Sequence, residues 1–194
     1  MVVLAAEVGT EVLYMGYLDC LHLEDAKLTC VFPHKEFVTD DKNAASLVLY
    51  YQDGAFDGLF TGEIGTDEEK WIAKHCDEWL EVQSDKGDDN GKSANNDKNV
   101  QKDKVSFGIV TGIDFYKVAH HGSKYSNSKL LLEMLKPEIA VVSAGMNNWY
   151  GHPHADTLER LAAIGCAVWN TAECGQIMIE GDADIVVTTV LCPD

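Results

Sequence analysis

The sequence predicts an α/β fold in which helices cover a mixed β-sheet. Three observations support this prediction. The first third of the chain contains short runs of β-forming residues, and from about residue 105 strand and helix patterns alternate. With 194 residues and a hydrophobic fraction of 46%, the chain is large enough to bury one core. We therefore expect a single domain over residues 1–194.

The expected strands of the first third are 12–15, 28–32, 46–51 and 58–61, separated by Gly, Asp and Lys. A helix is expected over 66–81. Thr66 and Glu69 have the spacing of a capping box at its start. Apolar residues then recur at helical spacing along one face of this segment.

Residues 83–104 interrupt the pattern, because this stretch has almost no apolar side chain and mixes Asp, Lys, Asn and Gly. Such a segment cannot offset its ordering entropy by burial, so it is predicted to be a flexible polar surface insertion. A recognition loop is the alternative interpretation.

The pattern of the second half predicts alternating strands and helices. Expected strands are 105–111, 115–119, 139–144, 168–170, 176–180 and 185–191. A helix over 128–136 is expected to stop before Pro137, and a second over 155–164 to end at Gly165.

The composition argues against several classes of protein. A net charge of -17, without a basic cluster, disfavours non-specific nucleic-acid binding. No apolar run reaches the roughly 18–20 residues of a membrane span, and the start resembles no signal peptide. None of the six cysteines forms a C-x-x-C pair, so a zinc knuckle is not expected. We expect reduced thiols in a cytoplasmic protein.

Three short segments carry residues suited to chemistry, each where a strand gives way to a turn. They are LFTGE (59–63), VAHHGS (118–123) and NNWYGHPH (147–154). A carboxylate and imidazoles at the edge of a rigid sheet are the typical donors of a zinc or manganese site.

Each segment also has a simpler interpretation. Glu63 can be a solvated turn residue at a helix start. In a strand, His120 and His121 would point to opposite faces, so only one of them could line a given site. His154 stands at a helix start, where capping is the default role.

The order of these motifs, with LKPEIAVVS between HHGS and YGHP, resembles the metallo-β-lactamase-like domain of ComEC-type DNA-uptake proteins and related free-standing hydrolases. The resemblance covers about residues 8–82 and 105–181. It implies a four-layer αββα sandwich and metal-assisted hydrolysis of a phosphodiester, with single-stranded DNA as a candidate substrate. It also implies that Glu63 and one of His120 and His121 bind zinc or manganese. The expected pocket residues are His152, Tyr150, Ser123, Asn147 and His34.

Two departures from the family pattern matter. The His-x-His/Asp-x-Asp-His run that supplies most of the family's ligands does not occur in this sequence, so the domain is expected to be N-terminally truncated. Glu63 also replaces the usual aspartate, which displaces the carboxylate by about 1 Å. We therefore expect weak or absent metal binding, an inactive chain, and self-association through an incomplete sheet. The alternative functions are a non-catalytic interaction module and a small-molecule hydrolase.

Overall fold

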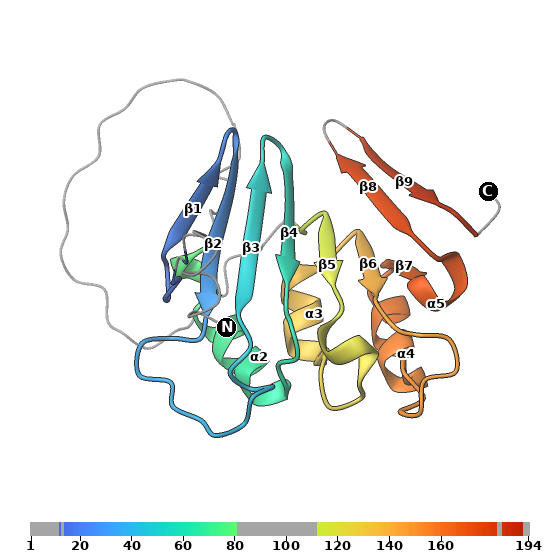
Figure 1. Cartoon of the computed structure of the whole chain (residues 1–194), viewed down its shortest axis with the longest axis horizontal. Coiled ribbons are helices and arrows are strands. Elements are labelled where there is room, and N and C mark those ends of the chain that lie inside the picture. Colours follow the sequence, from blue (N-terminus) through green and yellow to red (C-terminus); the bar gives the residue numbers. More distant parts are fainter. Residues whose placement is uncertain (1–11, 13, 81–111, 182–183, 192–194) are drawn as a thin grey trace, which may run out of the picture.

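A seven-stranded mixed sheet forms the centre of the computed structural model, which describes residues 12, 14–80, 112–181 and 184–191 (Figure 1). Its spatial order follows the chain from β1 to β7. The strands are β1 (Cys20–Leu23), β2 (Ala26–Phe32), β3 (Val48–Asp53), β4 (Phe56–Phe60), β5 (Phe115–Lys117), β6 (Ile139–Val142) and β7 (Ala167–Asn170). A separate hairpin pairs β8 (Ile177–Gly181) with β9 (Ile185–Thr189).

The sheet changes character at β4. Strands β1 to β4 are antiparallel neighbours, whereas β4 to β7 run parallel. All four residues of β6 are buried, as expected for a parallel strand covered on both faces. The carboxyl ends of β4, β5 and β6 therefore meet at one edge of the sheet, which lies at the bottom of Figure 1.

Helices cover one face of this sheet. They are α2 (Thr66–Lys74), α3 (Lys129–Leu135) and α4 (Ala155–Ala163). A core on this face joins Leu59 and Tyr116 of the sheet to Ile72, Leu132 and Leu161 of the three helices, all with no exposed surface. Burying each such aliphatic side chain contributes about 1.5–3 kcal/mol, so this layer holds the helices against the sheet.

The β8–β9 hairpin covers part of the opposite face. Phe115, Ile139 and Val141 form a second small core against hairpin residues such as Ile179. Beside the hairpin, a cavity of about 440 Å³ opens next to Phe60, which is 40% exposed. Helices, sheet and hairpin together confirm the predicted α/β fold. Self-association through an incomplete sheet stays a prediction.

Several predicted boundaries were wrong. The described residues of 12–15 are not in a strand, and the first strand begins at Cys20. Helix α2 ends at Lys74 and is followed by a short 3₁₀ helix, Cys76–Glu78. A short helix α5 (Thr171–Cys174) was not predicted. The predicted insertion at 83–104 and strand at 105–111 lie outside the described residues.

The predicted capping box at the start of α2 was also wrong. The cap residue is Gly65, whose N–H donates to the Glu68 carboxylate at 2.9 Å. Glu69 instead points into the protein and is fully buried. The sequence offers Glu at both positions, so spacing alone could not identify the capping residue.

The cysteines differ in state. Cys20, Cys30, Cys76 and Cys166 are free thiols, and burial raises the pKa of the Cys166 thiol to about 12. Cys174 is disulfide-bonded. The expectation of reduced thiols throughout was therefore wrong for Cys174, because pairing depends on a spatial approach that scattered spacing does not reveal.

Within the described ranges no helix has the length and apolar character to cross a bilayer.

A pair of aspartates joins β4 to the start of β5. The Asp57 carboxylate accepts hydrogen bonds from the Tyr50 hydroxyl and, at 3.0 Å, from the Asp114 N–H. The Asp57 N–H in turn donates to the Asp114 carboxylate at 2.8 Å. Burial raises the pKa of Asp57 above its ordinary value of 3.8, and the negative charge of Asp114 raises it further.

Asp57→Asn is expected to remove a loss of folding stability that occurs as the pH rises. Because the folded-state pKa of Asp57 is raised, its stabilising contribution is present below the unfolded value of 3.8 and is lost as pH rises through the folded value. The asparagine variant should therefore be more stable than wild type at pH 7, with the difference shrinking below about pH 4. Thermal unfolding across this range measures the effect, with the exposed Asp53→Asn as control. A difference that does not change with pH would contradict the assignment.

Candidate functional site

The candidate site lies at the edge where β4, β5 and β6 end, and hydrogen bonds to backbone carbonyls join the loops there. The Thr61 hydroxyl donates to the Lys117 carbonyl at 2.5 Å. The His120 N–H donates to the Gly62 carbonyl at 3.0 Å, and the His154 N–H donates to the Gly122 carbonyl at 3.0 Å. The three motifs that the sequence singled out therefore form one continuous surface.

The two adjacent histidines occupy a turn that follows β5, so the alternation of a strand, which would have let only one of them line a given site, does not apply. Strand β5 ends at Lys117, and Ala119–Gly122 form a 3₁₀ turn. His120 (φ 49°, ψ 47°) and His121 (φ 53°, ψ 21°) both adopt the left-handed conformation. Two consecutive left-handed residues remove the alternation of a strand, so both imidazoles face Glu63.

Glu63 lies between the two imidazoles. His120 Nε2 is 3.6 Å from Glu63 Oε2, and His121 Nε2 is 3.3 Å from Oε1. The three side chains are about one-third to one-half exposed. Each carboxylate oxygen therefore faces a different imidazole nitrogen, and all three groups remain open to a ligand.

The carbonyl of Ser143, directly after β6, fixes the His121 ring. His121 Nδ1 lies 2.5 Å from this carbonyl oxygen, which can only accept a hydrogen bond. Nδ1 therefore donates to this carbonyl, and Nε2 is the ring nitrogen that faces Glu63. Metal-binding histidines usually make this kind of second contact, which orients the ring.

His152 completes a group of histidine rings. Its ring centroid lies 5.7 Å from that of His120 and 6.3 Å from that of His121. Tyr150 also stacks on His152, with 5.7 Å between the ring centroids. Burial lowers the pKa of His152, and the neighbouring His154, His120 and His121 lower it further. His152 is therefore held toward its neutral form, in which it can donate a lone pair.

An open cavity of about 430 Å³ adjoins this group, lined by His121, Ser143, Tyr150 and His152 together with Asn148. Asn148 closes the loop around it by accepting from the His152 N–H at 2.8 Å and donating to the His152 carbonyl at 2.6 Å.

Four predicted residues have other surroundings. Ser123 is buried, and Asn147 is exposed, with Asn148 lining the cavity in its place. His34 stacks on Trp71 at 4.5 Å in a separate aromatic cluster. His154 stands at the N-cap of α4 without capping it, because its Nδ1 accepts from the Lys124 N–H at 3.2 Å. The capping role expected for His154 was therefore wrong.

The sequence did not identify three residues near the site. Lys117 lies at the end of β5, where burial lowers the pKa of its ammonium while the charge of Glu63 raises it. Glu69 and Asn127 are fully buried and hydrogen-bonded to each other. The position of Glu69 inside an amphipathic helix could have indicated a buried polar role. Its spacing from Thr66 was instead interpreted as a capping box.

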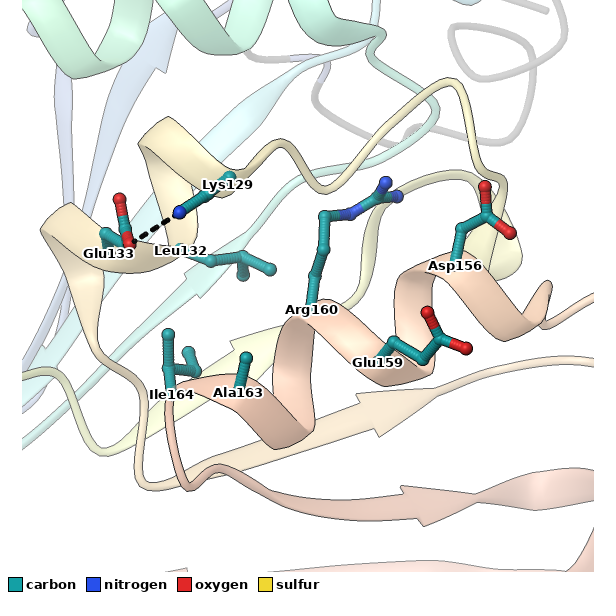
Figure 2. A pocket seen from close by; sticks show the side chains of 8 residues that line it. All are labelled: Lys129, Leu132, Glu133, Asp156, Glu159, Arg160, Ala163 and Ile164. Atoms are coloured by element: carbon teal, nitrogen blue, oxygen red, sulfur yellow. Dashed lines mark ion pairs between the residues drawn. The ribbon is translucent and has the colours of Figure 1, made fainter.

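A third cavity, of about 500 Å³, lies between α3 and α4 (Figure 2). Leu132 and Arg160 line it. Lys129 and Glu133 also line it and form an ion pair, with 3.5 Å between Nζ and Oε1. Arg160 extends from α4 toward the loop that precedes α3, where it donates to the Ser126 carbonyl at 3.0 Å. These contacts brace the helical layer.

Sequence comparisons place the chain beside parts of two much longer proteins. A stretch of 94 residues, 47% of this chain, is 35% identical to Recombination protein 2 of Haemophilus influenzae and spans 12% of it. A stretch of 173 residues, 89% of this chain, is 27% identical to ComE operon protein 3 of Bacillus subtilis and spans 18% of it. No family model matches the chain. These similarities support a link to the competence and DNA-uptake family that the motifs indicate.

Proposed function

We propose that Glu63, His120, His121 and His152 contribute to a divalent-metal centre, for zinc or manganese, in a hydrolase that cleaves phosphodiesters such as single-stranded DNA. The observation that carries the proposal is the position of Glu63, whose two oxygens face the Nε2 atoms of two different histidines at 3.6 and 3.3 Å. When bound, the ion would supply Lewis-acid stabilisation of the charge that develops during hydrolysis.

The donor chemistry and the two distances between Glu63 and the histidines support such an ion. Zinc takes imidazole nitrogen and carboxylate oxygen at about 2.0–2.2 Å, so two ligands of one tetrahedral ion lie about 3.4 Å apart. The separations at Glu63 are close to this value. The hydrogen bond from His121 Nδ1 to the Ser143 carbonyl supports the same role, because it leaves Nε2 free to bind.

The acidic character of the chain also bears on the proposal. A net charge of -17 repels a phosphodiester, and a bound divalent cation offsets this repulsion where the substrate must approach. Lys117, whose charge interacts with Glu63, adds a second cation at the same edge. The similarity to proteins named for recombination and the ComE operon favours DNA over a small-molecule substrate.

One observation favours a second function. Among the residues that the structure describes, no group of three or more His, Cys, Asp or Glu side chains is arranged to hold a metal ion. Under the metal proposal, the cluster would be one part of a centre that needs further donors. If metal binding fails altogether, a non-catalytic interaction module that keeps the fold is the better assignment.

Zinc is expected to bind weakly at this cluster, and calorimetric titration of the chain with zinc chloride tests the proposal. Four-ligand structural sites gain about 10–16 kcal/mol, and a site with fewer protein ligands should fall far below that range. Glu63→Gln and His121→Ala should each abolish detectable binding. His22→Ala, an exposed histidine on β1, serves as the matched control and should leave it unchanged.

Two results would contradict this assignment. Unchanged zinc binding in Glu63→Gln would place the metal elsewhere. A stoichiometric metal that survives dialysis would show that a further side chain, such as His154 beside His152, completes the site.

A further inference from the structure

The turn that presents the two histidines is held in a strained conformation. His120 and His121 have φ values of 49° and 53°, a region that disfavours residues with a Cβ atom, and Gly122 follows at 85°. A Cβ atom on Gly122 would lie 2.6 Å from Pro153 Cβ, so only glycine fits there. Such a turn persists only where its surroundings determine it.

The Asn127 side chain makes three hydrogen bonds to the backbone that flanks this turn. Its side chain is fully buried, and its Oδ1 accepts from the Ala119 N–H at 2.9 Å and from the Tyr116 hydroxyl at 3.0 Å. Its Nδ2 donates to the Ala119 carbonyl at 3.0 Å and to the Ser123 carbonyl at 3.4 Å. The side chain thus binds the backbone on both sides of the histidine pair.

Asn127 is itself held by Glu69 of α2. The Glu69 carboxylate accepts hydrogen bonds from the backbone N–H of Asn127 and, at 2.6 Å, from that of Ser128. Asn127 has φ 60°, a conformation that asparagine tolerates better than most residues. The backbone of Asn127 is therefore fixed in position, and its side chain can bind the histidine turn in one defined orientation.

The same segment is tied to the turn that carries Glu63. The Ser126 hydroxyl donates to the Ile64 carbonyl at 2.7 Å, and the Thr66 N–H donates to the Tyr125 carbonyl at 3.2 Å. Helix α2 begins directly after this turn and contributes Glu69. The turn that carries Glu63 and the turn that carries His120 and His121 are therefore held by the same buried hydrogen-bond network.

We propose that Asn127, anchored by Glu69, is the positioning residue that sets His120 and His121 against Glu63. The proposal rests on the proposed function for its consequence in metal binding, while the placement of the turn can be measured without metal. Asn127 touches neither the cavity nor the candidate ligands' side chains in any described contact, so it acts through the backbone of the turn.

Asn127→Gly tests the proposal, because glycine tolerates φ 60° and the change removes only the side chain. The control is Leu135→Ala in α3, a buried substitution remote from the turn, with both variants compared at equal distance below their melting temperatures. The first readout is hydrogen exchange at two amides of the turn. The His120 N–H donates to the Gly62 carbonyl, and the Ser123 N–H donates to the His120 carbonyl. The second is zinc affinity by calorimetry.

The His120 and Ser123 amides should exchange at least about ten-fold faster in Asn127→Gly than in the control, and zinc affinity should fall at least about ten-fold in Asn127→Gly alone. Equal exchange in the two variants would overturn the positioning role. Faster exchange without zinc binding in wild type would support the positioning role and refute the proposed metal site. If Asn127→Gly does not fold, Tyr116→Phe takes its place, because it removes one hydrogen bond to Asn127. Faster hydrogen exchange at the His120 and Ser123 amides in Tyr116→Phe than in the control would support the proposal. Unchanged exchange at these amides would overturn it.

Discussion

Glu69→Ala is expected to lower the free energy of unfolding by about 2–6 kcal/mol, because two buried backbone N–H groups each lose their acceptor at a cost of about 1–3 kcal/mol. Glu69 is fully buried, and its two oxygens accept from the backbone N–H groups of Asn127 and Ser128. Alanine would leave both donors without a partner and open a void beside Tyr116. Urea unfolding measures the loss.

The charge of Glu69 partly opposes this stabilisation. Burial raises the pKa of its carboxyl, whereas the hydrogen bonds from Ser128 and Asn127 and the charge of Arg160 lower it. The net effect of the side chain is nevertheless favourable, because buried backbone donors that lose their acceptor are expensive. Truncating Glu69 should therefore lower the free energy of unfolding more than truncating Glu68, the partly exposed glutamate of the same helix.

Glu68→Ala is the matched control, one residue away on α2. Glu68 accepts a single hydrogen bond, from the Gly65 N–H at 2.9 Å, in a partly exposed position. Losing this capping contact should lower stability by about 1 kcal/mol. Equal losses in the two variants would show that Glu69 is a helix-start residue, as its spacing from Thr66 first indicated, and that the buried network contributes little.

The arrangement of the motifs could be predicted from the sequence because it depends on strand order. Apolar runs ending in LFTGE, VAHHGS and the loop before GHP indicate successive strands whose carboxyl ends share an edge. The structure brings Glu63 next to both histidines and His152 beside them. Their role as metal ligands stays a prediction.

The details of the site could not be predicted because they depend on contacts between distant segments. The predicted strand 115–119 runs up to the histidines and says nothing of the left-handed turn in which Asn127 and Gly62 hold them. Glu69 and Asn127 are 58 residues apart in sequence. Nothing in local spacing links a glutamate in one helix to an asparagine before another, so their shared role emerges only from the fold.

The chain alone is expected to show no metal-dependent hydrolysis of single-stranded DNA or of bis-nitrophenyl phosphate above background. Activating water at neutral pH requires an ion held firmly beside an open coordination position, and the described donors do not complete such a site. Release of nitrophenolate and cleavage of a labelled oligonucleotide, each with added zinc or manganese, measure the activity.

Adding a segment that carries a His-x-Asp-x-Asp-His run, by fusion or as a second polypeptide, should restore turnover because it supplies the absent donors. Glu63→Asp should then increase turnover further, by up to about 10²-fold, since shortening the side chain by one methylene moves the carboxylate by about 1 Å toward the position of the family's usual aspartate. In the restored protein, His120→Ala or His121→Ala should abolish turnover, and His22→Ala, on the remote β1, should not. Robust hydrolysis by the unmodified chain, lost on changing either His120 or His121, would show that the donors already present are sufficient.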